Sequence, residues 1–278
     1  MRPTEGRPIA DQWTLQTIPI IPCICFIFFI LATLWSRTIP AEASLWVVFF
    51  SALLSSIAGF AFSPIAGAFL FHIFNDALLV VQILLIASIA QQIYCIWRLR
   101  SLIGSLEFLP YLAGSLLTLP FGIFLLLKSE VTSYLPVLGF VLIAYGALTV
   151  LKPTINIRRN VFAGRFVVGA LGGLTGGLAA FPAAFVTIWC QAQGFSKERQ
   201  RAIIQPFILV NQLVAVGILS FLRPFGTASI EVIQYMAPAI LGAYFGLLLF
   251  GRLNTASFNR IVGALLFLAG GTMASKIF

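Results

Sequence analysis

Charged side chains are scarce in this chain. Asp, Glu, Lys and Arg together make up only 9% of its 278 residues, and 60% of the residues are hydrophobic. Soluble domains carry about 25% charged residues, so a chain of this size with a mean hydropathy of +1.03 has too little polar surface to cover its apolar side chains. The composition excludes an ordinary soluble protein and predicts an integral membrane protein.

Residues that build catalytic and metal centres are also rare. There is one histidine, and the four cysteines all lie in or beside apolar runs. We interpret these cysteines as small buried hydrophobic residues rather than a disulfide framework or a metal site. The sequence contains no HExxH motif, no CxxC motif and no pair of catalytic carboxylates. It therefore predicts no enzyme activity, no cofactor and no metal site.

The net charge of +9 has a different meaning in a membrane protein than in a soluble one. Basic residues gather in the cytoplasmic loops of membrane proteins. We therefore interpret the charge as a sign of orientation, and we predict the lipid bilayer as a partner and no nucleic acid.

Long apolar runs alternate with short polar loops, as membrane-spanning helices require. Two runs, 45–74 and 165–193, are long and almost free of charge, and each holds glycine and proline near its centre. The other expected spans are 18–35, 76–97, 106–127, 134–151, 201–222, 230–250 and 257–277. Residues 41–43 (Ala-Glu-Ala) resemble a cleavage site, which leaves open whether the first span is retained or removed.

The order of these runs repeats within the chain. The segment Gly59–Pro64 (GFAFSP) matches Gly177–Pro182 (GLAAFP), and Gln82 matches Gln205. At nearly the same spacing, the later spans match Tyr111, Ala113, Phe121, Gly122, Gly139 and Gly146 with Tyr235, Ala237, Phe245, Gly246, Gly263 and Gly270. This ordered series predicts two tandem repeats preceded by one extra helix.

The basic residues predict how the two long runs lie in the membrane. If each run crosses once, the 17 Lys and Arg residues divide almost evenly between the two sides. If each run instead returns to the side from which it came, only Arg37, Lys128, Arg223 and Lys276 lie outside, which satisfies the positive-inside rule. Length agrees, because about thirty helical residues measure about 45 Å against a hydrocarbon thickness of ~30 Å.

We therefore predict an all-α polytopic membrane protein. It has two inverted tandem repeats, each a broken, re-entrant helical hairpin plus three spanning helices, with one extra N-terminal helix. The expected boundaries are 1–44 for the N-terminal tail and extra transmembrane helix, 45–151 for membrane repeat 1, 152–164 for a cytoplasmic basic linker and 165–278 for membrane repeat 2. Inverted repeats suit a transporter that works by alternating access.

Four segments carry a resemblance to a known family: IAGFAFSPIAG at 57–67, GALGGLTGGLAAFPAAF at 169–185, and the helices LPYLAGSLLTLPFGIFLL and IQYMAPAILGAYFGLLLF. This duplicated layout, over roughly 45–277, resembles the TauE/SafE family of sulfite and organosulfonate exporters. The resemblance implies a secondary transporter of the bacterial inner (cytoplasmic) membrane that exports small anions such as sulfite, organosulfonates or related organic acids. An anion channel on the same scaffold is the alternative. Substrate identity, direction of transport, coupling ion and assembly into a homo-oligomer stay open.

The centres of the two long runs are the expected binding site. A helix that ends inside the membrane leaves backbone N–H groups free, and its N-terminal end carries about half a positive charge. Such an end binds an anion without lysine or arginine, and no basic residue is expected inside any span. The candidate substrate-binding residues are Gly59, Ser63, Pro64, Gln82, Thr175, Gly176, Gly177, Pro182, Gln205 and Asn211. Substitution of Gly177 or Pro182 is expected to abolish transport and to leave the protein folded.

These candidates have structural alternatives. Glycines four residues apart, as in the pairs Gly172/Gly176 and Gly173/Gly177, also let helices pack closely. Buried amides also form hydrogen bonds between helices. Gln91 and Gln92, by contrast, are expected near the cytoplasmic end of their span and in contact with water.

Charged and titratable residues at the span ends complete the predictions. His72 and Asp76 follow the first long run together with Asn75. His72 and Asp76 are the candidates for proton coupling, His72 because the charge of a histidine changes near neutral pH; the alternative for His72 is a polar residue at the membrane interface. Residues 197–201 (KERQR) are expected to be a cytoplasmic anchor rather than part of the site.

Overall fold

The computed structural model describes residues 24–27, 39–74, 76–101, 106–128, 162–222 and 228–250, with residue 103 and scattered positions in 139–147 and 254–274. In this part of the chain every regular element is a helix, which confirms the all-α prediction. The helices are α2 (Ile39–Ala58), α3 (Phe62–Ile73), α4 (Ala77–Arg98), α5 (Leu109–Lys128), α7 (Phe162–Ala179), α8 (Ala184–Ala192), α9 (Lys197–Leu222), α10 (Ala228–Ile233) and α11 (Met236–Phe250). The linker 152–164 and the expected spans 18–35 and 134–151 lie largely outside the described residues.

Several of the described helices fit a polytopic membrane protein. Five are long and apolar enough to cross a membrane, namely Ala77–Arg98, Leu109–Lys128, Phe162–Ala179, Lys197–Leu222 and Glu231–Phe250. Large apolar side chains such as Leu117 and Phe121 on α5 are exposed on the outside of the protein. A wide exposed apolar surface is unfavourable in water but favourable in hydrocarbon. The spans expected from the hydropathy pattern begin within a few residues of these five helices.

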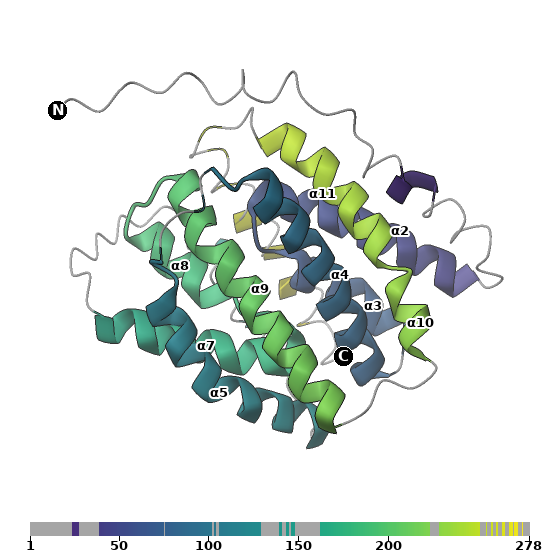
Figure 1. Ribbon diagram of the computed structural model, residues 1–278, viewed down its shortest axis with the longest axis horizontal. Coiled ribbons are helices and arrows are strands. Elements are labelled where there is room, and N and C mark those ends of the chain that lie inside the picture. Colours follow the sequence, from purple (N-terminus) through teal and green to yellow (C-terminus); the bar gives the residue numbers. More distant parts are fainter. Residues whose placement is uncertain are drawn as a thin grey trace.

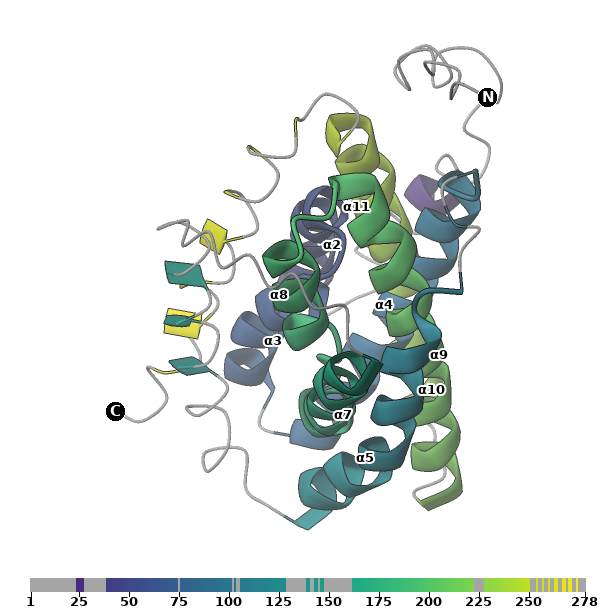
Figure 2. The ribbon, with the colours of Figure 1, turned by 90° about the vertical axis from the view of Figure 1, so that its left-hand side faces the viewer.

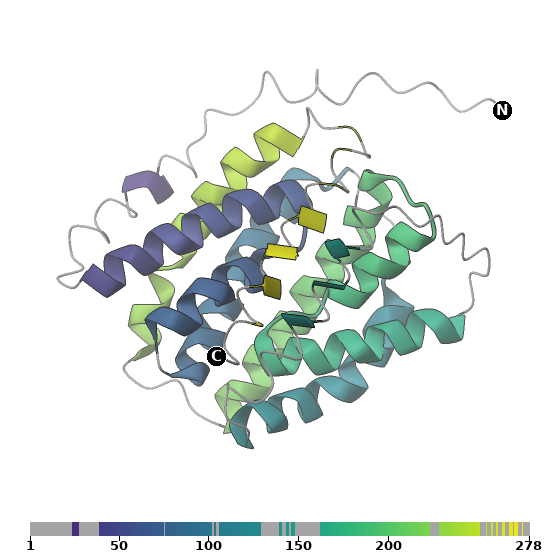
Figure 3. The ribbon, with the colours of Figure 1, turned by 180° about the vertical axis from the view of Figure 1, so that it is seen from behind.

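The helices pack in three neighbouring pairs (Figure 1). Helices α4 and α9 form the central pair. The pair α5 and α7 packs on the α9 side, and the pair α2 and α11 packs on the α4 side. The short helices α3 and α8 both lie on the same face of the central pair, as two further views show (Figures 2 and 3).

Both long apolar runs are interrupted at their glycine–proline centres. Helix α2 ends at Ala58 and is followed by Gly59, whose φ of 91° is unfavourable for any residue with a Cβ atom. Helix α7 ends at Ala179, and Ala180 follows with a φ of 55°. A non-glycine residue in this region costs roughly 1–2 kcal/mol, so the surrounding packing must hold Ala180 in place.

Each outer pair is packed so closely that backbones touch at glycine positions. A Cβ atom on Gly177 of α7 would lie 2.5 Å from the Leu119 carbonyl oxygen of α5. A Cβ atom on Gly246 of α11 would lie 2.7 Å from the Ser56 Cβ of α2 and even closer to the Leu53 carbonyl oxygen. Helices in membranes associate through small residues in this way. The packing alternative for the glycines is therefore confirmed at Gly177.

Candidate functional site

The start of α9 packs against the first break, which is the interruption at Gly59 between α2 and α3. Arg201 of α9 has only 1% of its surface exposed. Its Nη2 donates hydrogen bonds to the carbonyl oxygens of Ser56 and Ile57, the latter at 2.9 Å. These carbonyls belong to the last turn of α2, where helix carbonyls have no partner within the helix and carry partial negative charge. Arg201 therefore caps the interrupted helix.

This position corrects the expectation that residues 197–201 form only a cytoplasmic anchor. The sequence pattern placed the start of the span at residue 201, but α9 begins at Lys197. Arg201 consequently lies one helical turn inside α9, on the side that faces α2. The expectation that no basic residue lies inside a span is also wrong, because the apolar segment Lys197–Leu222 includes Arg201.

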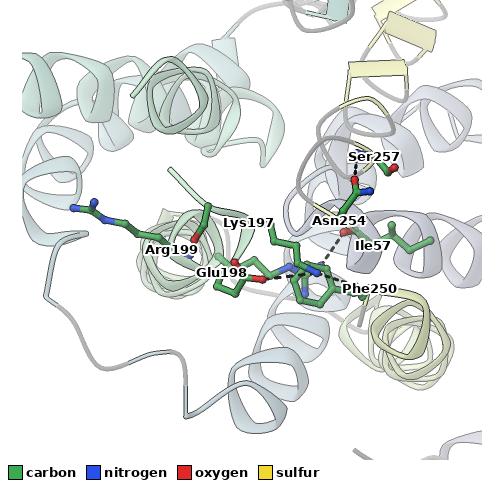
Figure 4. Close-up of polar contacts among 9 residues, drawn as sticks. Ile57, Lys197, Glu198, Arg199, Phe250, Asn254 and Ser257 are labelled. Atoms are coloured by element: carbon green, nitrogen blue, oxygen red, sulfur yellow. Dashed lines mark hydrogen bonds and ion pairs between the residues drawn. The ribbon is translucent and has the colours of Figure 1, made fainter. Parts of the chain in front are cut away.

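Aromatic and cationic groups surround Arg201 at the end of α11. The Cζ atom of Arg201 lies 3.6 Å from the centre of the Phe250 ring, and the Nζ atom of Lys197 lies 4.5 Å from it. Lys197 also donates to the Phe250 carbonyl oxygen at 3.4 Å and pairs with Glu198 at 3.7 Å. Figure 4 shows Lys197 and Phe250 side by side, with Ile57 of α2 opposite them. The ends of α2, α9 and α11 thus meet in one cluster.

Arg199 differs from Arg201 although it lies on the same turn of α9. Its side chain points away from the Lys197–Phe250 cluster (Figure 4). It is exposed and forms an ion pair with Glu107, with Nη2 and Oε2 2.9 Å apart. An exposed pair of this kind contributes little to stability. Arg199 therefore fits the anchor that the sequence predicted.

A buried group of polar side chains lies next to Arg201. The Nε2 of Gln91 on α4 donates to the hydroxyl oxygens of Ser55 at 2.8 Å and Ser56 at 3.0 Å. Gln91 and Gln92 are each 1% exposed. The expectation that these two amides lie in water is therefore wrong. They face the protein interior, as a polar side chain in a membrane span does when it bonds to a neighbouring helix.

The second break, which is the interruption at Ala180 between α7 and α8, is held by a threonine rather than an arginine. The hydroxyl of Thr175 donates to the Phe181 carbonyl oxygen at 2.8 Å, with the carbonyl oxygens of Leu171 and Gly172 at 3.1 and 3.2 Å. The Phe181 N–H in turn donates to the Thr175 carbonyl oxygen at 3.3 Å. Thr175 thus ties the end of α7 to the segment that follows it.

The neighbouring glycines of the second break face different partners. A Cβ atom on Gly176 would lie 3.0 Å from the Pro182 Cβ, so this glycine faces the break. Gly177 instead contacts α5. A bulky substitution at Gly177 therefore disturbs helix packing, contrary to the expectation that the protein would stay folded.

Both short helices begin inside the protein without a side-chain cap. The N-cap residues are Ala61 for α3 and Ala183 for α8, and neither has a side chain that accepts a hydrogen bond. Ser63 and Pro64 of the first α3 turn are buried, as is Ala184 at the start of α8. Two helix N-termini, each with about half a positive charge, therefore face the interior.

The two breaks are both close to the first half of α9. The first break contacts Arg201. A Cβ atom on Gly172 of α7 would lie 2.5 Å from the Pro182 carbonyl oxygen at the second break and 3.1 Å from the Phe207 ring. Arg201 and Phe207 are six residues apart on one helix, which is a distance of about 9 Å along its axis. The structure therefore brings the two glycine-rich segments to the same part of α9.

The predicted amides of the two central helices are all buried, but they have different partners. Asn211 bonds between helices, because it accepts a hydrogen bond from the Ser115 hydroxyl of α5 while its Nδ2 donates to the Phe207 carbonyl oxygen at 2.8 Å. Gln205 has no donor for its Oε1 among the described residues. Gln82 is also buried on α4. Gln205 thus has a free acceptor within the described part of the chain, as do Gln91, Gln92 and Gln212 on the same two helices.

The residues expected at the exit of the first run have local structural roles. Asp76 caps α4, because its Oδ1 accepts hydrogen bonds from the N–H groups of Leu78 at 2.9 Å and Leu79 at 3.2 Å. The Nδ1 of His72 lies 2.7 Å from the Ala68 carbonyl oxygen of its own helix. Both side chains are exposed, and Asn75 lies outside the described residues. Among the described residues, no group of His, Cys, Asp and Glu could hold a metal ion.

Sequence reasoning missed Arg201 and Gln91, although one signal was present for Arg201. Ser196 accepts a hydrogen bond from the Arg199 N–H at 3.3 Å and so caps α9, and Glu198 follows in the first turn. Serine before a segment with an early acidic residue is a helix-start signal. Applying it would have placed Arg201 inside the helix.

Comparison with known proteins gives the family. A family model described as Sulfite exporter TauE/SafE matches residues 44–273, which include both breaks, Arg201 and the central pair of helices. No curated protein matches the chain, and no solved structure matches it. The matched segment covers most of the sequence and agrees with the multi-pass helical fold. The chain belongs to the TauE/SafE sulfite exporter family of membrane transport proteins.

Proposed function

We propose that this protein is a secondary transporter that exports small anions, namely sulfite, organosulfonates or related organic acids, across the bacterial inner membrane. The family supports anion transport of the sulfite-exporter type. The proposal that this protein binds and exports these anions rests on one observation, the pair of uncapped, buried helix starts at Ala61 and Ala183. Each presents backbone N–H groups and the positive end of a helix dipole, which together favour an anion.

Contacts between equivalent glycines support an inverted arrangement of the two repeats. The sequence match pairs Gly139 with Gly263 and Gly146 with Gly270. In the structure the contacts are crosswise, because a Cβ atom on Gly139 would lie 2.8 Å from the Gly270 carbonyl oxygen and one on Gly146 2.6 Å from that of Gly263. Crosswise contacts are the pattern of a two-fold axis, and they make the two equivalent segments antiparallel.

The position of the first break supports a hairpin that returns to the side from which it came. The end of α2 contacts Gln91, near the end of α4. Helix α3 leads from this break to Ala77, the first residue of α4, which lies about 20 Å away along the α4 axis. The chain therefore travels back along α4 after the break.

The same arrangement provides a route for alternating access. In our proposal an anion binds between the two breaks, near Ser63 of α3 and Gly176 of α7, and the two repeats move relative to each other so that the site opens to one side at a time. The Thr175 hydroxyl is engaged by backbone carbonyls, so we assign it to holding the second break rather than to binding the substrate.

Flux measurements on purified protein in liposomes test this proposal. We expect sulfite or sulfonate uptake that saturates with concentration and that accelerates when the same anion is placed on the opposite side, since a carrier returns faster when loaded. Large currents that do not saturate would instead indicate a channel. Protein-containing vesicles that move sulfite, sulfoacetate and taurine no faster than empty vesicles would contradict the proposal. The same vesicles with an imposed proton gradient reveal whether protons are coupled to transport.

A further inference from the structure

We infer that Arg201 is the charged ligand of the anion site, and that a substrate oxygen binds to its free Nε atom beside the first break. This inference rests on the proposed transport function and deepens it. The helix-terminus proposal requires no basic side chain, whereas this one gives the site a fixed cation on α9.

The hydrogen bonds of Arg201 leave part of its guanidinium group without partners. Its Nη2 is used by the carbonyl oxygens of Ser56 and Ile57. Its Nε and Nη1 are buried and have no acceptor among the described residues. A buried charged donor without an acceptor is strongly unfavourable. An oxyanion placed against the Nε edge would accept from this donor and reduce that penalty.

Arg201 also has no carboxylate partner among the described ion pairs. Glu198 pairs with Lys197, and Glu107 pairs with Arg199. A buried cation is normally paired with an anion. The Phe250 ring and the two α2 carbonyls stabilise the cation partly, but neither carries a full negative charge. The neighbourhood of Arg201 is therefore suited to reversible binding of an anion.

Gly59 lies against the side of Arg201 that carries the free Nε. A Cβ atom on Gly59 would lie 3.3 Å from this nitrogen, so any larger side chain would cover it. Gly59 also stands only two residues before Ala61, the N-cap of α3. The free edge of Arg201 is thus next to the break at which the uncapped helix begins.

Comparison of the two halves argues against a purely structural role for Arg201. The sequence match of Gln82 with Gln205 places Leu78 at the position equivalent to Arg201. The second break has no arginine at this position, and the neutral hydroxyl of Thr175 donates to the Phe181 carbonyl oxygen across it. The second break is thus held without a charged side chain, which leaves the charge at the first break for another purpose.

The charge and the free donors of Arg201 define the class of ligand. Both paired N–H edges of a guanidinium group include Nη2, which the α2 carbonyls already engage, so the free Nε offers a single charged N–H donor. A charge-assisted hydrogen bond of this kind suits an oxygen of sulfite, a sulfonate or a carboxylate. We therefore assign small oxyanions to this site.

Three substitutions on one helical turn test the inference in full-length protein. The change Arg201→Gln removes the charge, Arg201→Lys keeps the charge but removes the Nε–H donor, and Arg199→Gln is the matched control on the exposed neighbour. We expect the KM for sulfite to rise about 100-fold in R201Q and about 10-fold in R201K, and to stay unchanged in R199Q. Sulfite should raise the melting temperature of wild type and R199Q but not of R201Q.

The outcomes separate this inference from the function on which it rests. A folded R201Q protein with the wild-type KM would overturn the role of Arg201 and leave anion transport intact. If R201Q does not fold, R201K decides, because an unchanged KM for sulfite would also overturn the inference. A lower maximal rate at unchanged KM in R201K would indicate a structural role only, which counts against it as well. A wild type that neither binds nor transports any oxyanion would instead refute the proposed function.

Discussion

Replacing Gly177 with valine is expected to remove the folded protein from detergent extracts. A Cβ atom at this position would lie 2.5 Å from the Leu119 carbonyl oxygen and 2.6 Å from the Ile123 nitrogen. Both atoms belong to the α5 backbone, which cannot move aside as a flexible side chain can. Overpacking of this kind costs about 3 kcal/mol or more, and here it separates two helices that pack along much of their length. Size-exclusion chromatography of the fluorescently tagged protein would measure the loss.

Gly217 offers the matched control for this prediction. It also lies inside an apolar helix, α9, but a Cβ atom there would meet no atom within 4 Å. We therefore expect Gly217→Val to elute as the wild type does. A monodisperse Gly177→Val protein with the wild-type melting temperature would show that α5 and α7 do not pack as described.

Replacing Thr175 with valine is expected to reduce transport at least 10-fold in a protein that still folds. Valine has nearly the same shape, so the packing is retained, but the hydrogen bond from the hydroxyl to the Phe181 carbonyl oxygen is lost. Leaving that buried carbonyl unpaired costs about 1–3 kcal/mol, and the strained backbone at Ala180 loses the shorter of the two hydrogen bonds that tie Phe181 to Thr175 of α7. Initial rates of sulfite flux in liposomes, together with the melting temperature, would measure both effects.

Two companion variants distinguish the break from a general effect of removing hydroxyls. Thr175→Ser keeps the hydroxyl and should restore most of the flux. Thr187→Val removes a buried hydroxyl that bonds only to the Ala183 carbonyl four residues earlier, so its flux should stay close to wild type. Equal losses of flux in Thr175→Val and Thr187→Val would argue against a special role for the second break.

The sequence predicted the helices and their interruptions because these depend on local chemistry. Apolar runs of a given length require a membrane, and a glycine such as Gly59 permits a backbone conformation that other residues avoid. The segment that each glycine contacts could not be predicted in the same way. Gly176 and Gly177 are adjacent and chemically identical, yet one faces Pro182 and the other faces α5, which only the packing of the helices decides.

Arg201 shows why the charged part of the site was beyond sequence reasoning. Its partners, the carbonyl oxygens of Ser56 and Ile57, are about 145 residues away in the chain. From the sequence alone, an arginine at the edge of an apolar run next to Lys197 and Arg199 resembles a cytoplasmic anchor. Arg199 is exposed and paired with Glu107, whereas Arg201 faces α2. The rotation of α9 against α2 decides which of the two arginines is buried.

The opposite orientation of the two halves is open to a test by labelling of single cysteines. In a background without the native cysteines, Phe74→Cys marks the end of the first broken run and Ser196→Cys marks the end of the second. A membrane-impermeant maleimide applied to intact cells should label residue 74, because the first run returns to the outside, whereas residue 196 should react only after the membrane is opened. Labelling of both residues from the cytoplasmic side alone would show that each run crosses the membrane and would contradict the account.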